Sequence, residues 1–308
     1  MRLIGILFGM EQSFPPALVE RINSKGIDDI RAEFVKVGAL TMETILPYDV
    51  ILDRISQDVP FYRSMLKLAM LNGTRVINNP FWWSADDKFF SYALMHKIGV
   101  PIPRTVLLPS KEHPPDTTSE SFRNLIYPLN WEEVFNYVGF PAFLKPHLGG
   151  GWKKVFYVRS VEEFFATYDQ TGDTVMVLQQ AIEFEEYYRC YVIGKRYIRI
   201  MPYEPRNPHH LRYVASFTPS EQLRKEMERH CLSIAKASGY DFFTVEFAVQ
   251  NGTPYAIDFL NPAPDAELYS VQEENFEWVV EYSARFLIEQ AKRGRRTPKE
   301  FRWSQLIK

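Results

Sequence analysis

The stretch Tyr240–Asp265 constrains the fold of this sequence most, because it places two apolar runs on either side of Asn251-Gly252. Asn-Gly between two apolar runs is the strongest short-range signal for a β-hairpin. Each predicted strand carries one acid among apolar neighbours, Glu246 in the first and Asp258 in the second. A carboxylate on a buried strand costs free energy unless a partner offsets its charge. The two acids therefore indicate either a shared cation or, if the hairpin lies at the surface, two solvated side chains.

The register of this hairpin decides whether the two acids face each other. If Asn251 and Gly252 alone form the loop, Asp258 lies opposite Val245 and Glu246 points to the other face. One more loop residue places Glu246 directly opposite Asp258, with their Cβ atoms about 4.5–5.5 Å apart. Pro254 cannot donate a ladder hydrogen bond, which favours the longer loop. We therefore predict a loop of more than two residues and a carboxylate pair suited to Mg²⁺, with phosphate oxygens completing the shell.

The bulk composition restricts the class of protein. The chain has 308 residues, of which 46% are hydrophobic and 24% charged, as is typical of globular proteins of about two domains. The net charge of −2 argues against a broad nucleic-acid surface. Cys190 and Cys231 lack metal-type spacing, which predicts reduced thiols and a cytoplasmic protein. The sequence shows neither a signal peptide nor an apolar run of the ~20 residues that cross a membrane.

Residues 1–77 alternate strand-like and helix-like segments and so predict a small parallel α/β domain. Ligands of such sheets bind beyond the carboxyl ends of the strands, so Arg54 and Arg63 are candidate substrate contacts, with surface salt bridges as the alternative. The predicted strands are Arg2–Phe8, Ile30–Val37, Asp49–Leu52 and Thr74–Ile77, and the predicted helices are Pro15–Lys25 and Tyr62–Asn72.

Two segments carry lysines and glycines suited to phosphate. Lys88 lies in the first turn of a helix that we expect Ser84 to cap, where a cation is unfavourable near the helix dipole. A bound phosphate explains a lysine there, and a solvated lysine is the alternative. The predicted strand Ala142–Lys145 leads into Gly149-Gly150-Gly151, whose backbone amides can approach phosphates closely. A glycine turn without a ligand fits that pattern equally well.

The remaining segments predict a long surface loop, Leu107–Asn130, and then alternating helices and strands. Arg189 and Arg199 lie on two of these strands, and a buried arginine pairs with a carboxylate or a phosphate. The polar loop Pro202–Arg212 adds a second basic group, which consists of Arg206, His209, His210 and Arg212. The expected helices are Trp131–Val138, Val161–Tyr168, Glu221–Ser238 and Glu274–Lys292, and the expected strands are Val155–Val158, Val175–Gln180, Tyr188–Ile193 and Tyr197–Met201.

In their order and spacing these segments resemble the ATP-grasp superfamily from about residue 78 to residue 291, with a layout similar to glutathione synthase, D-alanine–D-alanine ligase and the ribosomal-protein glutamate ligase. The resemblance implies an α/β (α+β) protein that binds a nucleotide between two α+β subdomains. It implies four parts: a pre-ATP-grasp α/β domain at 1–77, a subdomain with the lysines and glycine loop at 78–180, a metal-binding subdomain at 181–291, and a basic tail at 292–308.

The resemblance also implies which residues bind ATP. Two lysines and the glycine loop would hold the phosphates. The segment after the strand Val175–Gln180 would hold the adenine, and a following acid would hold the ribose, with Glu185 as the alternative to Glu186. The implied ATP contacts are Lys88, Lys145, Gly149, Gly150, Gly151, Gln179, Gln180, Ile182 and Glu186.

Two Mg²⁺ ions, with Mn²⁺ as a substitute, are implied for the acids of the hairpin. Glu246 and Asp258 would bind them together with Asn261. The superfamily usually has one residue between the second acid and the asparagine, whereas this chain has two, so Asn261 reaches the same face only if the chain bulges after Asp258. The implied catalytic residues, which offset charge in the transition state, are Lys145, Arg189 and Arg199.

The activity that the resemblance implies is an ATP-dependent ligation. A carboxylate becomes an acylphosphate and is joined to an amine or a thiol, with release of ADP and phosphate. The basic residues predict a small acidic or amino-acid-like substrate. A phosphotransferase and a non-catalytic nucleotide-binding module are the alternatives. We expect no nucleic-acid or membrane partner, and a homodimer is the default oligomer.

Overall fold

The computed structural model describes residues 1–83, 87–149, 153–213 and 217–296. The chain forms two compact units, and each is described by itself. Unit 1 comprises residues 1–85, 186–247 and 258–308, and unit 2 comprises residues 86–185 and 248–257. Parallel and antiparallel sheets occur together with helices, which confirms the predicted α/β (α+β) class. The four-part division given above stays a prediction.

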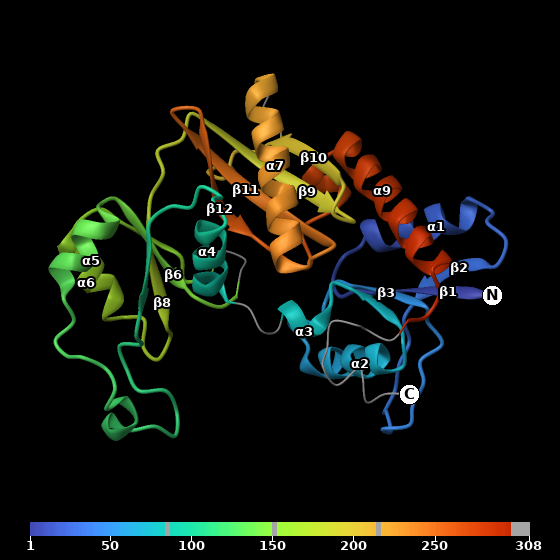
Figure 1. Ribbon diagram of the computed structural model, residues 1–308, viewed down its shortest axis with the longest axis horizontal. Coiled ribbons are helices and arrows are strands. Elements are labelled where there is room, and N and C mark those ends of the chain that lie inside the picture. The colour runs from blue at the N-terminus through green and yellow to red at the C-terminus, as the bar shows by residue number, and fades with distance from the viewer. Residues whose placement is uncertain (84–86, 150–152, 214–216, 297–308) are drawn as a thin grey trace. The chain divides into compact units, whose positions relative to one another are not determined.

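A four-stranded parallel sheet forms the N-terminal part of unit 1, in the order β2-β1-β3-β4. All four residues of β3 are buried, as is typical of a parallel strand covered on both faces. Proline in the first turn of α1 and of α2 suits the fixed φ of that position. The elements are β1 (Arg2–Leu7), α1 (Phe14–Ser24), β2 (Ile30–Phe34), β3 (Val50–Asp53), α2 (Pro60–Leu71) and β4 (Arg75–Ile77), all close to the predicted segments (Figure 1).

A second sheet has the order β10-β9-β11-β12, and α7 (Glu221–Ser238) lies across one face of it (Figure 1). Ser220 caps the start of α7, and Gly239 ends it in the left-handed conformation, with φ 77°. Cys190 on β9 and Cys231 on α7 are both buried at this contact. The strands are β9 (Glu186–Ile193), β10 (Tyr197–Pro202), β11 (Phe242–Gln250) and β12 (Thr253–Phe259), and β11 and β12 continue into unit 2.

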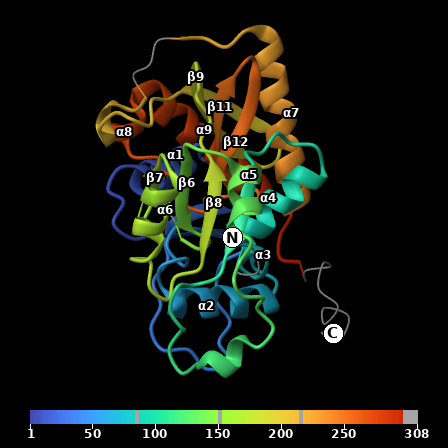
Figure 2. The same cartoon turned by 90° about the vertical axis from the view of Figure 1, so that its left-hand side faces the viewer.

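Unit 2 contains an antiparallel sheet in the order β5-β8-β6-β7. Phe164 and Tyr168 pack with Val138 and Leu144 in its core. Trp131 is 5.4 Å from Phe164 between ring centroids and extends this core. The elements are β5 (Thr105–Leu108), α5 (Trp131–Val138), β6 (Ala142–Pro146), β7 (Phe156–Val158), α6 (Val161–Tyr168) and β8 (Met176–Gln180) (Figure 2).

Several short elements differ from the sequence predictions. The predicted loop Leu107–Asn130 begins inside β5 and contains the 3-10 helix η1 (Ser119–Phe122), because neither segment is long enough to show a hydrophobic period. The one-turn helices α3 (Pro80–Trp83) and α8 (Leu268–Val271) escaped prediction for the same reason. The helix after α3 is α4 (Lys88–Lys97), whose cap is Asp87. Ser84, the predicted cap, lies outside the described residues. No helix among the described residues is long and apolar enough to span a membrane.

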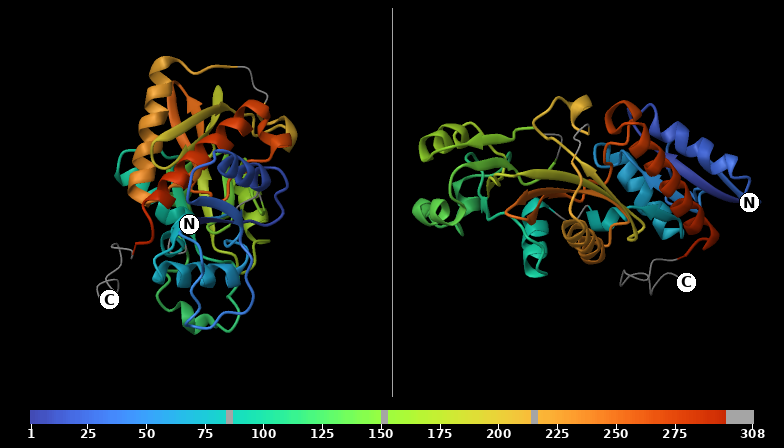
Figure 3. Two further views of the ribbon diagram at one scale, coloured as in Figure 1. Left: turned by 90° about the vertical axis from the view of Figure 1, so that its right-hand side faces the viewer. Right: turned by 90° about the horizontal axis from the view of Figure 1, so that it is seen from above.

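The last helix, α9 (Glu273–Lys292), lies along α1 in unit 1 (Figure 3). Glu281 on α9 accepts hydrogen bonds from Lys25, Arg21 and Arg285, the first of them at 2.8 Å. Partial burial acts to raise the pKa of Glu281, but these hydrogen bonds outweigh it and lower the pKa to about 2. The charged form of Glu281 therefore stabilises the contact between the two helices.

We expect Glu281→Gln to lower the free energy of unfolding at pH 7 by about 1 kcal/mol, a value discounted for solvent screening. Because the folded-state pKa lies below the unfolded value of about 4.3, the stabilisation is present above that value and is lost as pH falls toward about 2. Thermal unfolding from pH 7 to pH 2 measures this, with Glu20→Gln, an exposed acid of α1, as the control. A difference from wild type that persists unchanged at pH 2 contradicts the assignment.

Two glycines with positive φ allow a matched test of packing. Gly194 has φ 63°, and a Cβ built there would lie 2.6 Å from the Phe286 ring on α9. Gly252 has φ 73°, and a Cβ there would have nothing within 4 Å. We expect Gly252→Ala to cost about 1 kcal/mol, from the left-handed backbone alone, and Gly194→Ala about 3 kcal/mol, from backbone and overpacking together. Urea denaturation compares the two, and equal losses would show that the Phe286 contact contributes nothing.

Candidate functional site

Glu246 lies on the face of the second sheet that α7 does not cover. Side chains alternate along a strand, so Tyr187 and Arg189 of β9 share one face, while Cys190 faces α7. The Tyr187 hydroxyl donates to Glu246 Oε2 at 2.7 Å, and Arg189 Nε lies 3.6 Å from Glu246 Oε1. Burial raises the pKa of Glu246, Arg189 opposes that shift, and the charge of Asp258 adds to it. A buried carboxylate is therefore held between a guanidinium and a second acid.

Tyrosines surround Arg189. Its Nη1 donates to the Tyr213 hydroxyl at 2.8 Å, and its guanidinium carbon lies 5.5 Å from the centre of the Tyr203 ring. Burial raises the pKa of the Tyr187, Tyr203 and Tyr213 phenols. The phenols therefore stay protonated, and the site combines one buried cation with neutral hydroxyl donors. Arg189 Nε has no hydrogen-bond partner among the described residues, which leaves a donor for a ligand oxygen.

The loop of the hairpin differs from the prediction. β11 ends at Gln250 and β12 begins at Thr253, and both loop residues have positive φ, 50° and 73°, as in a two-residue type I′ turn. The predicted longer loop is therefore wrong. The reason lies in Pro254: the N–H of Ala256, two residues on, donates to the Pro101 carbonyl rather than to β11. The nitrogen of Pro254 lies on the same side of β12 as the N–H of Ala256, away from β11. Pro254 therefore removes no hydrogen bond between β11 and β12.

This loop changes how the two acids relate. A regular register counted from a two-residue loop places Val245, not Glu246, opposite Asp258. Asp258 is exposed, and its charge still raises the pKa of Glu246, so the carboxylates are neighbours that do not face each other. Two carboxylates with such a charge interaction offer the hard oxygen ligands that Mg²⁺ prefers.

Asn261 follows a break in β12. The strand ends at Phe259, and Leu260 has a left-handed φ of 66°. Asn261 is exposed, and its side-chain oxygen accepts from the Ala263 N–H at 3.0 Å. Its part in a metal site stays a prediction. Within the described residues no three His, Cys, Asp or Glu side chains form a metal-binding group. The donor set of Glu246 and Asp258 thus fits a Mg²⁺ ion that also takes oxygens from its ligand.

Lys145 is buried in unit 2, with 7% of its surface exposed. Its Nζ donates to the Tyr92 hydroxyl and to Gln179 Oε1, both at 2.8 Å. Gln179 Nε2 donates onward to Thr105 Oγ1 at 2.9 Å, and the Tyr92 hydroxyl donates to the Ile257 carbonyl at 3.0 Å. These bonds hold the lysine in one orientation.

Lys88 lies beside the start of the glycine loop. Its backbone N–H donates to the His147 carbonyl at 3.0 Å, and its Nζ donates to the Gly149 carbonyl. Gly149 has φ 83°, and a Cβ placed there would have no heavy atom within 4 Å. The backbone at Gly149 is therefore open to close approach by a ligand. Gly150 and Gly151 lie outside the described residues.

Comparison with known proteins identifies the fold. The chain is similar to the RimK domain ATP-grasp protein of Sphaerobacter thermophilus DSM 20745, with 15% identity, a TM-score of 0.66, and 93% of this chain and 99% of that chain covered. This chain has the ATP-grasp fold. It is also similar to D-alanine–D-alanine ligase of Bacillus anthracis complexed with ATP, with 16% identity, a TM-score of 0.61, and 95% and 98% covered.

A third similar structure is the ATP-grasp ligase PsnB complexed with its minimal precursor, Mg and ADP, with 14% identity, a TM-score of 0.59, and 94% of this chain and 97% of that chain covered. No family model matches the sequence, and no curated protein does. The similar structures therefore establish the fold of this chain. At sequence identities of 14–16% they do not establish its activity, which has to be argued from the side chains.

The residues predicted to bind adenine and ribose lie at the end of β8 and in the segment that follows it in the chain. Gln180 Oε1 accepts from Arg104 Nε at 3.2 Å, and the Ile182 N–H has no partner among the described residues. Glu185 is exposed and accepts from the Asn251 N–H, whereas Glu186 accepts from the Tyr188 hydroxyl. Alternation along β9 directs Glu186 away from the face of Arg189. The adenine and ribose roles stay predictions.

Most of the other predicted basic residues are already paired. Arg199 shares the sheet face of Arg189 but bonds Asn275 and Glu274 at the start of α9, at 3.0 and 2.7 Å. Arg54 is buried against Glu11, and its Nη2 donates to the Pro264 carbonyl at 2.6 Å. Contacts of the remaining candidates are Arg63 with the carbonyls of Ser56 and Gln57, Arg206 with Glu204, Arg212 with Asn207 and Tyr203, and His209 with Asp265.

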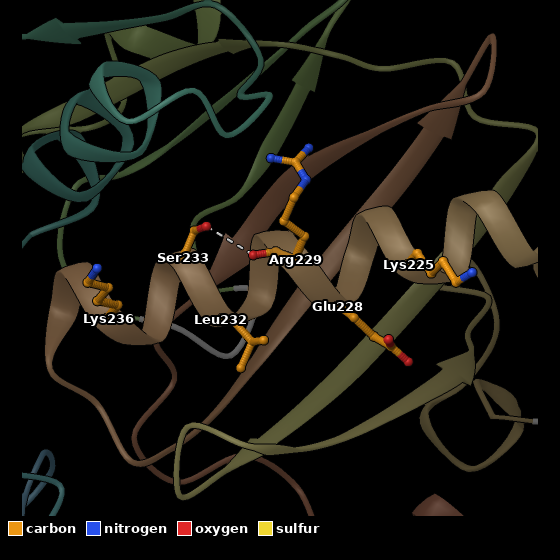
Figure 4. A pocket seen from close by; sticks show the side chains of 6 residues that line it. All are labelled: Lys225, Glu228, Arg229, Leu232, Ser233 and Lys236. Atoms are coloured by element: carbon orange, nitrogen blue, oxygen red, sulfur yellow. Dashed lines mark hydrogen bonds between the residues drawn. The ribbon is translucent and has the colours of Figure 1, made fainter.

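A shallow cavity of about 420 Å³ on the outer surface of α7 lies apart from these residues (Figure 4). Of its basic residues, Lys225 pairs with Glu221 at 3.1 Å and Arg229 with Glu226 at 3.7 Å. These pairs are typical of a solvated helix surface. The candidate site residues therefore remain two groups, Glu246 with Arg189 in unit 1 and Lys145 with its partners in unit 2, each described within its own unit.

Proposed function

We propose that this protein is an ATP-dependent ligase, which activates a carboxylate as an acylphosphate and joins it to an amine, releasing ADP and phosphate. The observation that carries the proposal is the buried Glu246, held beside Asp258 and the guanidinium of Arg189 within an ATP-grasp fold. A chain that only bound nucleotide would have no need to keep two neighbouring acids beside a buried arginine.

The comparisons agree with a ligase. The similar structures include D-alanine–D-alanine ligase, a D-Ala:D-Ser ligase of Enterococcus faecalis, and PsnB, which was solved with Mg and ADP. Glu246 and Asp258, with Asn261 as the third candidate, would hold two Mg²⁺ ions, which supply charge neutralisation at the β- and γ-phosphates. Carboxylate and amide oxygens suit Mg²⁺ and accept Mn²⁺.

The protein side chains do the rest by position and charge. Lys88, Lys145 and the backbone at Gly149 bind phosphate oxygens, and the segment from Gln180 to Glu186 holds the nucleoside. Arg189 offsets the negative charge that develops as the substrate carboxylate attacks the γ-phosphorus and as phosphate later leaves. The Tyr213 hydroxyl fixes the guanidinium for this purpose. Arg199 takes part only if it exchanges Glu274 for the substrate.

The experiment is a measurement of ADP and phosphate release with MgATP across standard amino acids, dipeptides and polyamines. A ligase releases phosphate in step with ADP and consumes both a carboxylate and an amine. ADP with a phosphorylated product and no free phosphate indicates a phosphotransferase instead. Nucleotide binding without turnover under every condition contradicts an enzyme.

A further inference from the structure

Unit 1 contains a second pair of titratable side chains in contact, His209 and Asp265. His209 lies in the 3-10 helix η2 (His209–Leu211), and its Nε2 is 3.1 Å from Asp265 Oδ2. The His209 side chain is 50% exposed, whereas that of Asp265 is 18% exposed. The imidazole therefore has one edge fixed against a carboxylate. His209 Nδ1, on the other edge, makes no hydrogen bond within the described parts of the chain.

Asp265 is itself held in place. Its Oδ1 accepts from the Glu267 N–H at 3.1 Å, its Oδ2 accepts from the Ser270 hydroxyl, and its carbonyl accepts from the Tyr191 hydroxyl. A carboxylate fixed in this way keeps the proton of the histidine on Nε2 and leaves Nδ1 as the basic nitrogen. This is the arrangement by which an acid orients an imidazole that acts as a general base.

The pair is continuous with the Arg189 group. Tyr191 stands two residues from Arg189 on the same face of β9. The pKa of Tyr213 is raised by burial and is affected by the charges of Arg189, Asp265 and Glu246. The phenol of Tyr213 therefore lies within electrostatic reach of both Glu246 and Asp265, inside one unit.

Titratable groups around His209 come from three segments. Asp265 precedes α8, and the Tyr269 ring of α8 has its centroid 6.1 Å from that of His209. On the histidine's own loop, Arg206 pairs with Glu204 at 2.6 Å, and Arg212 donates to the Asn207 carbonyl and the Tyr203 hydroxyl. His210 is the adjacent residue and is exposed. These side-chain contacts of the two arginines are with acceptors other than His209.

We propose that His209 accepts the proton that the attacking amine loses, and that Asp265 is its positioning residue. The role rests on the ligase activity proposed above. In this step the amine nitrogen forms a bond to the acyl carbon, and the bond from that carbon to the phosphate oxygen breaks. Phosphate leaves with the electron pair, and the N–H proton passes to His209 Nδ1 and then to solvent.

The test separates amine attack from acylphosphate formation by the choice of nucleophile. Wild type and His209→Gln are supplied with MgATP and the standard L-amino acids, either alone or with hydroxylamine. Hydroxylamine is largely unprotonated at neutral pH and traps acylphosphates as hydroxamates without a general base. The amide and the hydroxamate are both measured. His96→Gln is the control, since it removes an exposed imidazole in the last turn of α4 and leaves the Asp265 pair intact.

We expect His209→Gln to lower amide formation about 100-fold or more and to change hydroxamate formation by less than about twofold. Asp265→Asn should show the same split with a smaller loss, and His96→Gln should show none. Equal loss of both products in His209→Gln would mean a structural role, and unchanged amide formation would mean no role, so either result overturns the proposal. If the wild-type protein forms no amide, the proposed ligase activity itself is wrong. That outcome is read from wild type alone and does not depend on the variants.

Discussion

Replacing Glu246 with glutamine will lower MgATP turnover by about 100- to 1000-fold. Glutamine preserves the side-chain shape and the acceptor for the Tyr187 hydroxyl, but it removes the charge that pairs with Arg189 and that we propose binds Mg²⁺. The variant also leaves a guanidinium buried without its counter-ion, which costs about 3 kcal/mol of stability. ADP release with increasing Mg²⁺ measures the first effect and urea denaturation the second.

Asp258→Asn distinguishes loss of activity from loss of stability. Asp258 is exposed, so this variant should unfold like wild type while it requires more Mg²⁺ for turnover. Glu204→Gln, which removes a half-buried acid paired with Arg206, is the control for a general charge effect. If the double variant Glu246→Gln/Asp258→Asn turned over ATP at the wild-type rate, the metal assignment would be wrong.

Replacing Lys145 with methionine will weaken ATP binding by about 10- to 100-fold, the worth of one charge-assisted bond to phosphate. Methionine fills the same space, so the β6–β8 pairing remains. The change leaves Gln179 Oε1 without its donor in a buried position, which costs a further ~1–3 kcal/mol of stability. The rise in melting temperature on adding MgATP reports the affinity, because a ligand stabilises in proportion to ln(1 + [L]/Kd).

Lys97→Met is the matched control for Lys145→Met. Lys97 is exposed in the last turn of α4 and makes none of these contacts. It should retain the full rise in melting temperature. A Lys145→Met protein that also retains it would show that this lysine does not touch the nucleotide.

The long periodic segments were predictable from sequence. The helices Trp131–Val138, Val161–Tyr168 and Glu221–Ser238 have the expected bounds, since apolar spacing and caps agree in each. The hairpin was predictable in existence from Asn251-Gly252, but its register was not. The direction in which a strand proline points depends on which segments lie on either side of the strand. Here the segment is that of the Pro101 carbonyl, which is far away in sequence.

The partners of the charged residues could not be predicted from the sequence either. Lys145 and Arg189 stood out as candidates because cations among apolar residues need partners. The identity of those partners, Tyr92 and Gln179 for one and Tyr213 for the other, depends on tertiary contacts between distant segments. The positions of Tyr187 and Tyr191, each two residues from Arg189, could have predicted tyrosines beside the guanidinium, since alternate positions on a strand share a face. Arg54 shows the opposite case, a predicted substrate contact that is buried with Glu11 instead.

The tyrosines around Arg189 have a consequence for how the protein responds to alkali. Burial raises the pKa of each of these phenols, and Arg189 keeps its charge beside them. The three phenols therefore stay neutral and Arg189 stays charged at neutral and at moderately alkaline pH. We therefore expect a decline of activity in that range to come from groups other than these three phenols. Tyrosine-to-phenylalanine changes can then remove hydroxyl donors one at a time from a background that does not itself titrate.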